Sequence, residues 1–343
     1  MTDTGALFSF RDEEGAIRCG LCPRHCVFRK NGDSGFCGTR RLVDNELIAA
    51  NYGRLIAARS DPIEKKPLYH YAPGSLSFSI ATAGCNLSCP FCQNYSISQD
   101  TKHLLKKGRV PGEFIAPEDL VNMARSENCR SISVTYTEPV LLLEYVKDVS
   151  PIARKRDIGV VFVTNGAYSP EAAAEVAGLI DAANVDLKCF STKRYKEVCG
   201  VGLSSVLDTI ETLVSAGVWV EITTLVVPGF SDDEEELAAA AGHIASVSKD
   251  IPWHISRFHP DYKWTDTGAT PLDLMKRARE TGLEAGLKYV YTGNVMIDPG
   301  TDTYCTGCGQ KLISRHGFSA RVEGIQNGKC TNCGTAVAGR RLP

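Results

Sequence analysis

The stretch AGCNLSCPFCQN, residues 83–94, places Cys85, Cys89 and Cys92 in a C-x3-C-x2-C spacing. Three thiolates are one short of the four that usually close a metal site. A [4Fe–4S] cluster held by three cysteines leaves one iron open to a ligand from outside the protein. A structural zinc site would need a fourth ligand from elsewhere in the fold, because residues 80–100 contain no further cysteine or histidine. The spacing favours the cluster, with zinc as the alternative.

Short, β-branched and almost wholly apolar segments recur on the C-terminal side of this motif, as expected of parallel strands buried on both faces. The expected strands cover 76–84, 131–136, 159–166, 184–188, 218–229 and 252–260, with 288–294 as a possible seventh. Helical patterns lie between them at 117–128, 140–156, 170–182, 205–217, 231–249 and 270–286. Ser231, three positions before Glu234, is the expected cap of the fifth helix. The alternation predicts an α/β fold, a partial (β/α)6 TIM-like barrel that is open on one side.

Polar residues lie at the ends of these expected strands. In a parallel barrel the carboxyl ends of the strands meet at one rim, where active sites are built. We expect one shared site there, formed by Cys85, Glu138, Asn165, Asp186, Lys188, Glu221 and His259. Each residue also has a structural interpretation: Glu138 leads into a helix, Asn165 starts a turn, His259 ends a strand, and a carboxylate inside a strand, as at Glu221, must be paired or functional.

Two further cysteine sets flank the expected barrel. The first, Cys19, Cys22, Cys26 and Cys37, suits either zinc or an auxiliary [4Fe–4S] cluster, with His25 as an alternative ligand. The second has the knuckle spacing of a zinc ribbon, with iron as the alternative, and comprises Cys305, Cys308, Cys330 and Cys333. The sequence therefore predicts a Cys-rich extension at 1–70, a barrel at 71–298 and a zinc-ribbon-like module at 299–343. The stray residues Cys129, Cys189 and Cys199 are interpreted as small buried side chains.

The three-cysteine motif after a first strand, with Phe91 just before the last cysteine, resembles the signature of radical S-adenosylmethionine (SAM) enzymes. The resemblance implies that SAM chelates the open iron. It also implies that reductive cleavage of SAM yields a 5′-deoxyadenosyl radical, which abstracts hydrogen from a substrate. The missing fourth ligand is then the cosubstrate itself.

The same resemblance implies roles for residues of the barrel rim. The segment TYTEP, residues 135–139, is similar to the one that meets the SAM amino group, with Glu138 as the acidic residue. Thr164 and Asn165 match the third strand end. The D-x-K formed by Asp186 and Lys188 is similar to one that lies beside SAM in glycyl-radical activating enzymes. His259 matches the position near the adenosine, and we include the strand residue Glu221 among the cofactor-binding candidates.

Within that family the chain resembles the activating-enzyme-like group of the AmmeMemoRadiSam system. The stretches CGLCPRHC, VDLKCFSTKRYKEVCG, HISRFHPDY and the C-terminal knuckles carry this resemblance. It implies Memo-like and AMME-syndrome candidate-like proteins as partners, together with a one-electron donor such as flavodoxin or ferredoxin. Pyruvate formate-lyase-activating enzymes are similar too, but they usually lack both flanking cysteine sets. Installation of a glycyl radical on a partner protein is therefore the alternative activity.

Composition restricts the remaining classes of function. The chain of 343 residues carries 38 basic and 40 acidic residues, a balance that disfavours binding to nucleic acid or to an anionic membrane. The N-terminus lacks the pattern of a signal peptide, and no apolar run reaches spanning length. We expect a cytoplasmic protein whose clustered cysteines bind metal rather than form disulfides. The non-enzymatic alternative is a zinc-ribbon interaction scaffold with zinc at all three cysteine sets.

Overall fold

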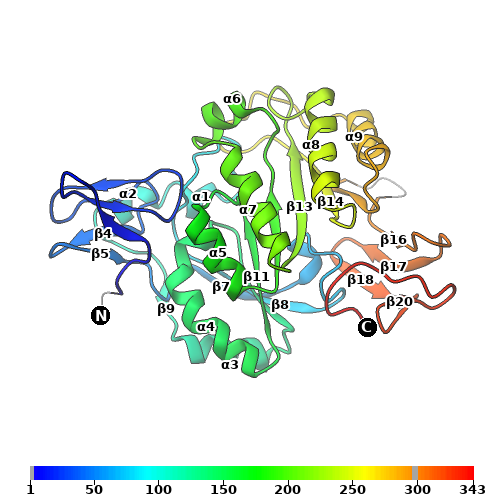
Figure 1. The fold of residues 1–343 in the computed structure, drawn as a ribbon, viewed down its shortest axis with the longest axis horizontal. Coiled ribbons are helices and arrows are strands. Elements are labelled where there is room, and N and C mark those ends of the chain that lie inside the picture. Colours follow the sequence, from blue (N-terminus) through cyan, green and yellow to red (C-terminus); the bar gives the residue numbers. More distant parts are fainter. Residues whose placement is uncertain (1–3, 296–299) are drawn as a thin grey trace.

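The computed structural model describes residues 4–295 and 300–343, and its centre is a sheet of eight strands (Figure 1). Seven of these strands run parallel and follow one another in chain order across the sheet. They are β8 (Leu76–Ala81), β10 (Ser131–Val134), β11 (Gly159–Thr164), β12 (Ala182–Asp186), β13 (Trp219–Val226), β14 (Trp253–Arg257) and β15 (Val290–Gly293). The eighth, β7 (Ala57–Pro62), pairs antiparallel with β8 at one edge.

Helices pack along the sheet and bury its strands. The six long ones are α3 (Pro117–Ser126), α4 (Leu143–Lys155), α5 (Pro170–Leu179), α7 (Ser204–Ser215), α8 (Glu234–Val247) and α9 (Leu272–Glu284). The short helices are α1 (Tyr95–Ser98), α2 (Lys102–Lys106) and α6 (Thr192–Arg194), and single helical turns lie at 63–65, 139–142 and 195–199. Within the described ranges no single helix has the length and apolarity to cross a bilayer, although the bent pair Thr192–Cys199 and Ser204–Ser215 passes such a test together.

The structure confirms an α/β fold with parallel strands in chain order, and it makes the possible seventh strand a member of the sheet. It differs from expectation at β7, which no sequence pattern indicated. The expected cap Ser231 is also wrong, because α8 begins later: Asp233 caps it by accepting a hydrogen bond from Glu236 N at 3.0 Å. The Ser231 hydroxyl instead donates to Leu225 O at 2.7 Å and closes the turn after β13.

The N-terminal residues form a separate set of small sheets at one end of the molecule (Figure 1). The strands are β1 (Ser9–Arg11), β2 (Ile17–Cys19), β3 (Val27–Phe28), β4 (Arg40–Val43), β5 (Glu46–Ala49) and β6 (Arg54–Leu55). β6 pairs with β9 (Glu113–Phe114), which comes from later in the chain. A buried ion pair fastens them to α4: Arg40 Nη2 lies 2.9 Å from both carboxylate oxygens of Glu144. Glu144 also accepts Leu7 N at 2.9 Å.

The C-terminal residues form small antiparallel sheets at the other end (Figure 1). They contain β16 (Thr303–Tyr304), β17 (Lys311–His316), β18 (Ser319–Val322), β19 (Ile325–Gln326) and β20 (Lys329–Cys330). Arg315 of β17 docks them on the chain before β8, since its guanidinium donates to Tyr69 O at 2.7 Å and lies 4.1 Å above the Tyr69 ring centroid. The expected module boundary at 298–299 falls outside the described residues.

The Glu221 carboxylate binds several polar groups near the segment on which Arg315 docks. It is fully buried as the third residue of β13, and four donors converge on its carboxylate. The backbone amides of Tyr69 and His70 donate at 2.9 and 2.8 Å, Trp219 Nε1 at 3.0 Å, and His254 Nε2 lies 2.7 Å away. Burial raises the pKa of this carboxyl, but His254 and the other donors outweigh burial and hold it below its usual value. Glu221 thus joins the segment before β8 to β13 and β14.

Removing the Glu221 carboxylate should destabilise the protein. Glu221→Ala leaves several buried donors without an acceptor, so we expect the free energy of unfolding in urea to fall by about 3–5 kcal/mol. The control is the exposed Glu235→Ala on α8, for which we expect a change within about 0.5 kcal/mol. Equal, small effects in both variants would contradict a structural role for Glu221.

Candidate functional site

A cavity of about 1000 Å³ opens at the carboxyl ends of the parallel strands. Its wall contains all three cysteines of the central motif, which follow β8, and side chains from β12, β13, β14 and β15. Five of the seven residues expected to share one site line this cavity, namely Cys85, Glu138, Asn165, Asp186 and Lys188. Cys89 and Cys92 of the cysteine motif line it with them, whereas Glu221 and His259 do not.

The loop that carries the cysteines is held in place by an amide network. Asn86 donates to Ala167 O at 3.0 Å and accepts from Asn165 Nδ2 at 2.8 Å. The same Asn165 amide lies 3.7 Å from Cys85 Sγ. Further along the loop, Leu87 N points at Cys85 Sγ at 3.4 Å. Because both asparagines are buried, this network fixes the orientation of Cys85 relative to β11.

Glu138 connects this network to the second parallel strand. Its carboxylate is buried and accepts three hydrogen bonds, from Val140 N at 3.1 Å, Thr164 Oγ1 at 2.8 Å and Asn165 N at 2.9 Å. Burial raises the pKa of this carboxyl to about 7, and the hydrogen bonds oppose the rise only in part. Glu138 therefore borders the cavity as a carboxyl group that titrates near neutral pH.

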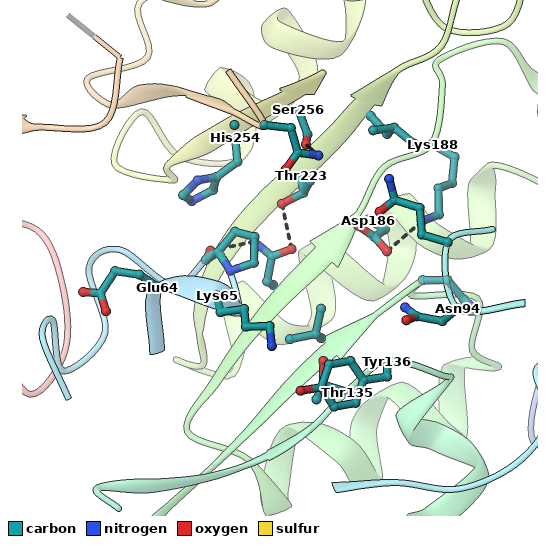
Figure 2. A pocket seen from close by; sticks show the side chains of 18 of the residues that line it. Glu64, Lys65, Asn94, Thr135, Tyr136, Asp186, Lys188, Thr223, His254 and Ser256 are labelled. Atoms are coloured by element: carbon teal, nitrogen blue, oxygen red, sulfur yellow. Dashed lines mark hydrogen bonds and ion pairs between the residues drawn. The ribbon is translucent and has the colours of Figure 1, made fainter. Parts of the chain in front are cut away.

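Asp186 and Lys188 form an ion pair on the cavity wall at the end of β12. Lys188 Nζ lies 2.7 Å from Asp186 Oδ2, and Figure 2 shows the two side chains meeting in the pocket. Burial lowers the pKa of the Lys188 ammonium, but the charges of Asp186 and the Cys89 thiol more than offset burial and raise it. Lys188 is thus a permanent cation beside the cysteine loop. Glu64 and Lys65 reach the same pocket from a different segment of the chain (Figure 2).

Three predicted residues do not line the cavity. The Thr164 hydroxyl donates to Glu138 and pairs with Tyr168 OH at 2.7 Å, so it supports a wall residue from behind. Glu221 lies near the amino end of β13, where protein donors occupy its carboxylate. His259 is exposed beyond the end of β14, and its ring lies 3.3 Å from Gln93 Nε2. Gln93, in contrast, does face the cavity.

Two features of the site carried no recognised sequence signal. The thiol of Cys199 is fully buried beside Cys89, whereas the sequence suggested only a small core residue. The C-terminal sheets complete the cavity wall, with Arg315, His316 and Asp302 among the lining residues. Cys199 ends the turn 195–199, whose sequence YKEVC has no apolar periodicity, and the position of β17 depends on long-range docking. Neither position could therefore be predicted from local periodicity.

The C-terminal cysteines converge on one point. Cys305, Cys308, Cys330 and Cys333 have all their sulfur atoms within 4.8 Å of one another. The Cys305–Cys333 and Cys308–Cys330 distances are 3.6 and 3.7 Å. A tetrahedral ion with bonds of about 2.3 Å to sulfur holds its ligands about 3.8 Å apart, so this set matches a single metal ion.

The N-terminal cysteines gather around a second, much smaller cavity. Its lining includes Cys19, Cys22, Cys26 and Cys37 together with Arg24, Arg40 and Asn86. His25, the alternative ligand, is exposed and is not among the lining residues. Asn86 therefore lies between this cavity and Cys85.

Comparison with known proteins finds a matching family model and several similar proteins. The profile of the Radical SAM superfamily matches residues 79–241. The chain is 38% identical over 335 residues to an uncharacterized protein of Methanocaldococcus jannaschii, covering 97% of this chain and 98% of that protein. A putative glycyl-radical enzyme activating enzyme of the same organism is 27% identical over 66% of this chain and 90% of its own length. The pyruvate formate-lyase 1-activating enzyme of Escherichia coli is 27% identical over 62% of this chain and 89% of its own length.

The raised pKa of Glu138 predicts a pH-dependent contribution to stability. The usual carboxyl pKa is 4.5 and the folded value is about 7, so the folded protein binds this proton more tightly. The resulting stabilisation is fully present below pH 4.5 and is lost as the pH rises through 7. In urea unfolding of the metal-free protein, the difference between wild type and Glu138→Gln should fall by up to about 3 kcal/mol over this range. Parallel pH profiles would contradict this assignment.

Proposed function

Because the chain belongs to the radical SAM superfamily, we propose that its large cavity binds SAM beside a [4Fe–4S] cluster held by Cys85, Cys89 and Cys92. The chain is an enzyme of the radical SAM type. One observation carries the assignment of the site: the three cysteines, a buried carboxyl and an Asp–Lys pair border the same cavity of about 1000 Å³. In this proposal the parallel sheet is the wall of a partial barrel, and the cavity is its interior.

The donor set fits the cluster that the family implies. All three central cysteines border the cavity. Within residues 4–295 and 300–343, only the C-terminal set has its sulfur atoms all within 4.8 Å of one another, so the central sulfurs lie farther apart. Such spacing is too wide for one ion but suits thiolates that each bind a different iron. When bound, the cluster and SAM supply a 5′-deoxyadenosyl radical that abstracts hydrogen from the substrate. The protein contributes binding, orientation and exclusion of water.

The wall residues have complementary charges for the polar end of SAM. We assign the carboxylate of Glu138 to the cosubstrate amino group and the ammonium of Lys188 to its carboxylate, with Asp186 holding Lys188 in place. Asn165 orients Cys85 through its side-chain amide. Thr164 acts through Glu138. His259 and Glu221 lie outside the cavity lining, which supports a role at its entrance for the first and a structural role for the second.

A small-molecule substrate is the first candidate, because a cavity of about 1000 Å³ is of the size that small-molecule sites have. Asp302, Arg315 and Phe318, from the C-terminal part of the chain, belong to its wall. Installation of a glycyl radical on a partner protein is the second candidate, and the names of two relatives favour it. A stable complex with a glycyl radical protein would support that candidate over the first.

Partners follow from the proposed chemistry. Cleavage of SAM requires one electron, which a flavodoxin or ferredoxin would deliver. Assignment to the AmmeMemoRadiSam system, with Memo-like and AMME-syndrome candidate-like partners, rests on the sequence resemblance. We propose zinc for the C-terminal site, because the sulfur spacing suits a single tetrahedral ion and the knuckles fold a module with little core of its own. We propose that the protein acts in the cytoplasm.

Loss of one central cysteine should abolish the chemistry without unfolding the chain. Anaerobically reconstituted protein with dithionite and SAM should form 5′-deoxyadenosine, and Cys89→Ser should reduce this to background because the cluster loses a ligand. Cys129→Ser is the matched control, since Cys129 is equally buried but contacts Ser60 far from the cavity. We expect its activity to stay within about twofold of wild type. Background activity in the reconstituted wild type would overturn the proposed function.

Removal of the C-terminal metal should weaken the end of the molecule that closes the cavity. We expect about one zinc per chain at this set, lost in a Cys305→Ser/Cys330→Ser variant together with a clear drop in Tm. Cys189→Ser, a buried cysteine outside all three sets, should retain the zinc. Iron at this site in protein purified from a zinc-replete medium would contradict the assignment of zinc.

A further inference from the structure

The sulfur atoms of the N-terminal cysteines, like those of the central set, are less closely gathered than the sulfur atoms of the C-terminal set. The four C-terminal sulfurs all fall within 4.8 Å of one another, whereas no three of the N-terminal sulfurs do. Yet all four N-terminal cysteines border one small cavity, so they face a common centre. A single zinc ion would draw its thiolates to about 3.8 Å separation. Thiols that converge on a shared space at wider spacing match a polynuclear cluster, in which each thiolate binds its own iron.

We propose that Cys19, Cys22, Cys26 and Cys37 hold a second [4Fe–4S] cluster, which accepts one electron from an acidic carrier protein and passes it to the central site. The relay role rests on the proposed function, while the cluster itself does not. The electron reduces the N-terminal cluster from the 2+ to the 1+ state and then leaves it for the central cluster. No bond forms or breaks and no proton is transferred in this step, and the reduced carrier is the reductant.

Hydrogen-bond donors and buried cations surround the four thiols. Phe36 N points at Cys26 Sγ at 3.4 Å, and Thr39 Oγ1 lies 3.3 Å from Cys37 Sγ. Both guanidinium groups that line the cavity have spare capacity: within the described ranges, Arg24 Nη2 and Arg40 Nε are buried without a hydrogen-bond partner. Four thiolates around a cluster carry a net negative charge, and these unpaired N–H donors are placed to stabilise it.

The N-terminal set adjoins the central site through bonded and packed atoms. Asn86, the residue next to Cys85, forms part of the N-terminal cavity wall, and Arg24 Nε donates to Asn86 O. Cys37 O lies so close to Gly84 that a Cβ there would come within 2.4 Å of it. The residues on either side of Cys85 therefore contact the segment that carries the N-terminal set. An electron that reaches the first set has a short, well-packed path to the second through contacting and hydrogen-bonded atoms.

Two segments rich in basic residues lie together near the N-terminal set. Residues 102–109 contain lysine and arginine but no acid, and Asp33 is the only acid within 29–41. These two segments lie together, because the Arg41 guanidinium contacts Gly108 and Leu105 packs on Gly38. Their exposed charged side chains are Arg29, Lys30, Lys106, Lys107 and Arg109. This patch is open to a protein of opposite charge.

The cluster is tested in a variant without the central one. Full-length Cys85→Ala/Cys89→Ala/Cys92→Ala protein, reconstituted anaerobically, should retain about four irons per chain with the Mössbauer spectrum of a cubane. Adding Cys22→Ser/Cys37→Ser should remove them. Zinc in place of iron, or a folded protein with neither metal, would overturn the proposal. Should the triple variant not fold, wild-type iron decides: about eight irons support a second cluster and about four refute it. These readouts do not depend on SAM cleavage, so they separate this proposal from the proposed function.

The relay is tested by charge reversal on the basic patch. In Lys106→Glu/Lys107→Glu, 5′-deoxyadenosine formation with a reduced acidic flavodoxin should fall about tenfold, while dithionite-supported formation should not change. Lys155→Glu/Lys276→Glu reverses two exposed lysines elsewhere and should behave as wild type. In Cys22→Ser/Cys37→Ser the flavodoxin-supported rate should fall further than the dithionite-supported rate. Equal effects with both reductants, or no effect in either variant, would refute the relay.

Discussion

The carboxylate of Glu138 is the contact on which the rest of the site depends. It receives hydrogen bonds from the chain after β10 and from the end of β11, so it fixes the separation of two strand ends. From Asn165 the constraint continues through a side-chain amide to Asn86 and the Cys85 sulfur. A buried carboxyl is costly unless it is satisfied in this way, and the cost is visible in its raised pKa. The protein thus keeps a costly buried carboxyl on the cavity wall and surrounds it with donors.

The three cysteine sets differ in how closely the fold gathers their sulfur atoms. Paired knuckles in the C-terminal sheets bring four sulfurs to within 4.8 Å, which suits one ion. The central and N-terminal sets place their thiols around open space instead. Sequence spacing alone could not distinguish these cases, because C-x2-C occurs in both the N-terminal and the C-terminal set. The difference arises from the tertiary contacts that hold each loop.

The sequence predicted the parallel strands well, because strands buried on both faces give continuous apolar runs. It also predicted that residues from different strand ends, such as Asp186 and Glu138, would meet. It could not place residues within a strand: Glu221 belongs to an eight-residue strand and lies near its amino end, away from the cavity. It gave no indication of Arg315 on the cavity wall, since that position depends on the docking of β17 against Tyr69. Local patterns encode elements, whereas docking depends on contacts between residues far apart in the chain.

The C-terminal sheets have a consequence for the order in which the active compartment is made during translation. Because Asp302, Arg315 and Phe318 belong to the cavity wall, that wall stays incomplete until the ribosome has synthesised the segment that follows β15. The cysteine loop, in contrast, leaves the ribosome early. A nascent chain that had already acquired iron would expose it to solvent and oxygen. Docking of the C-terminal sheets therefore decides when the wall around the cysteine loop is complete.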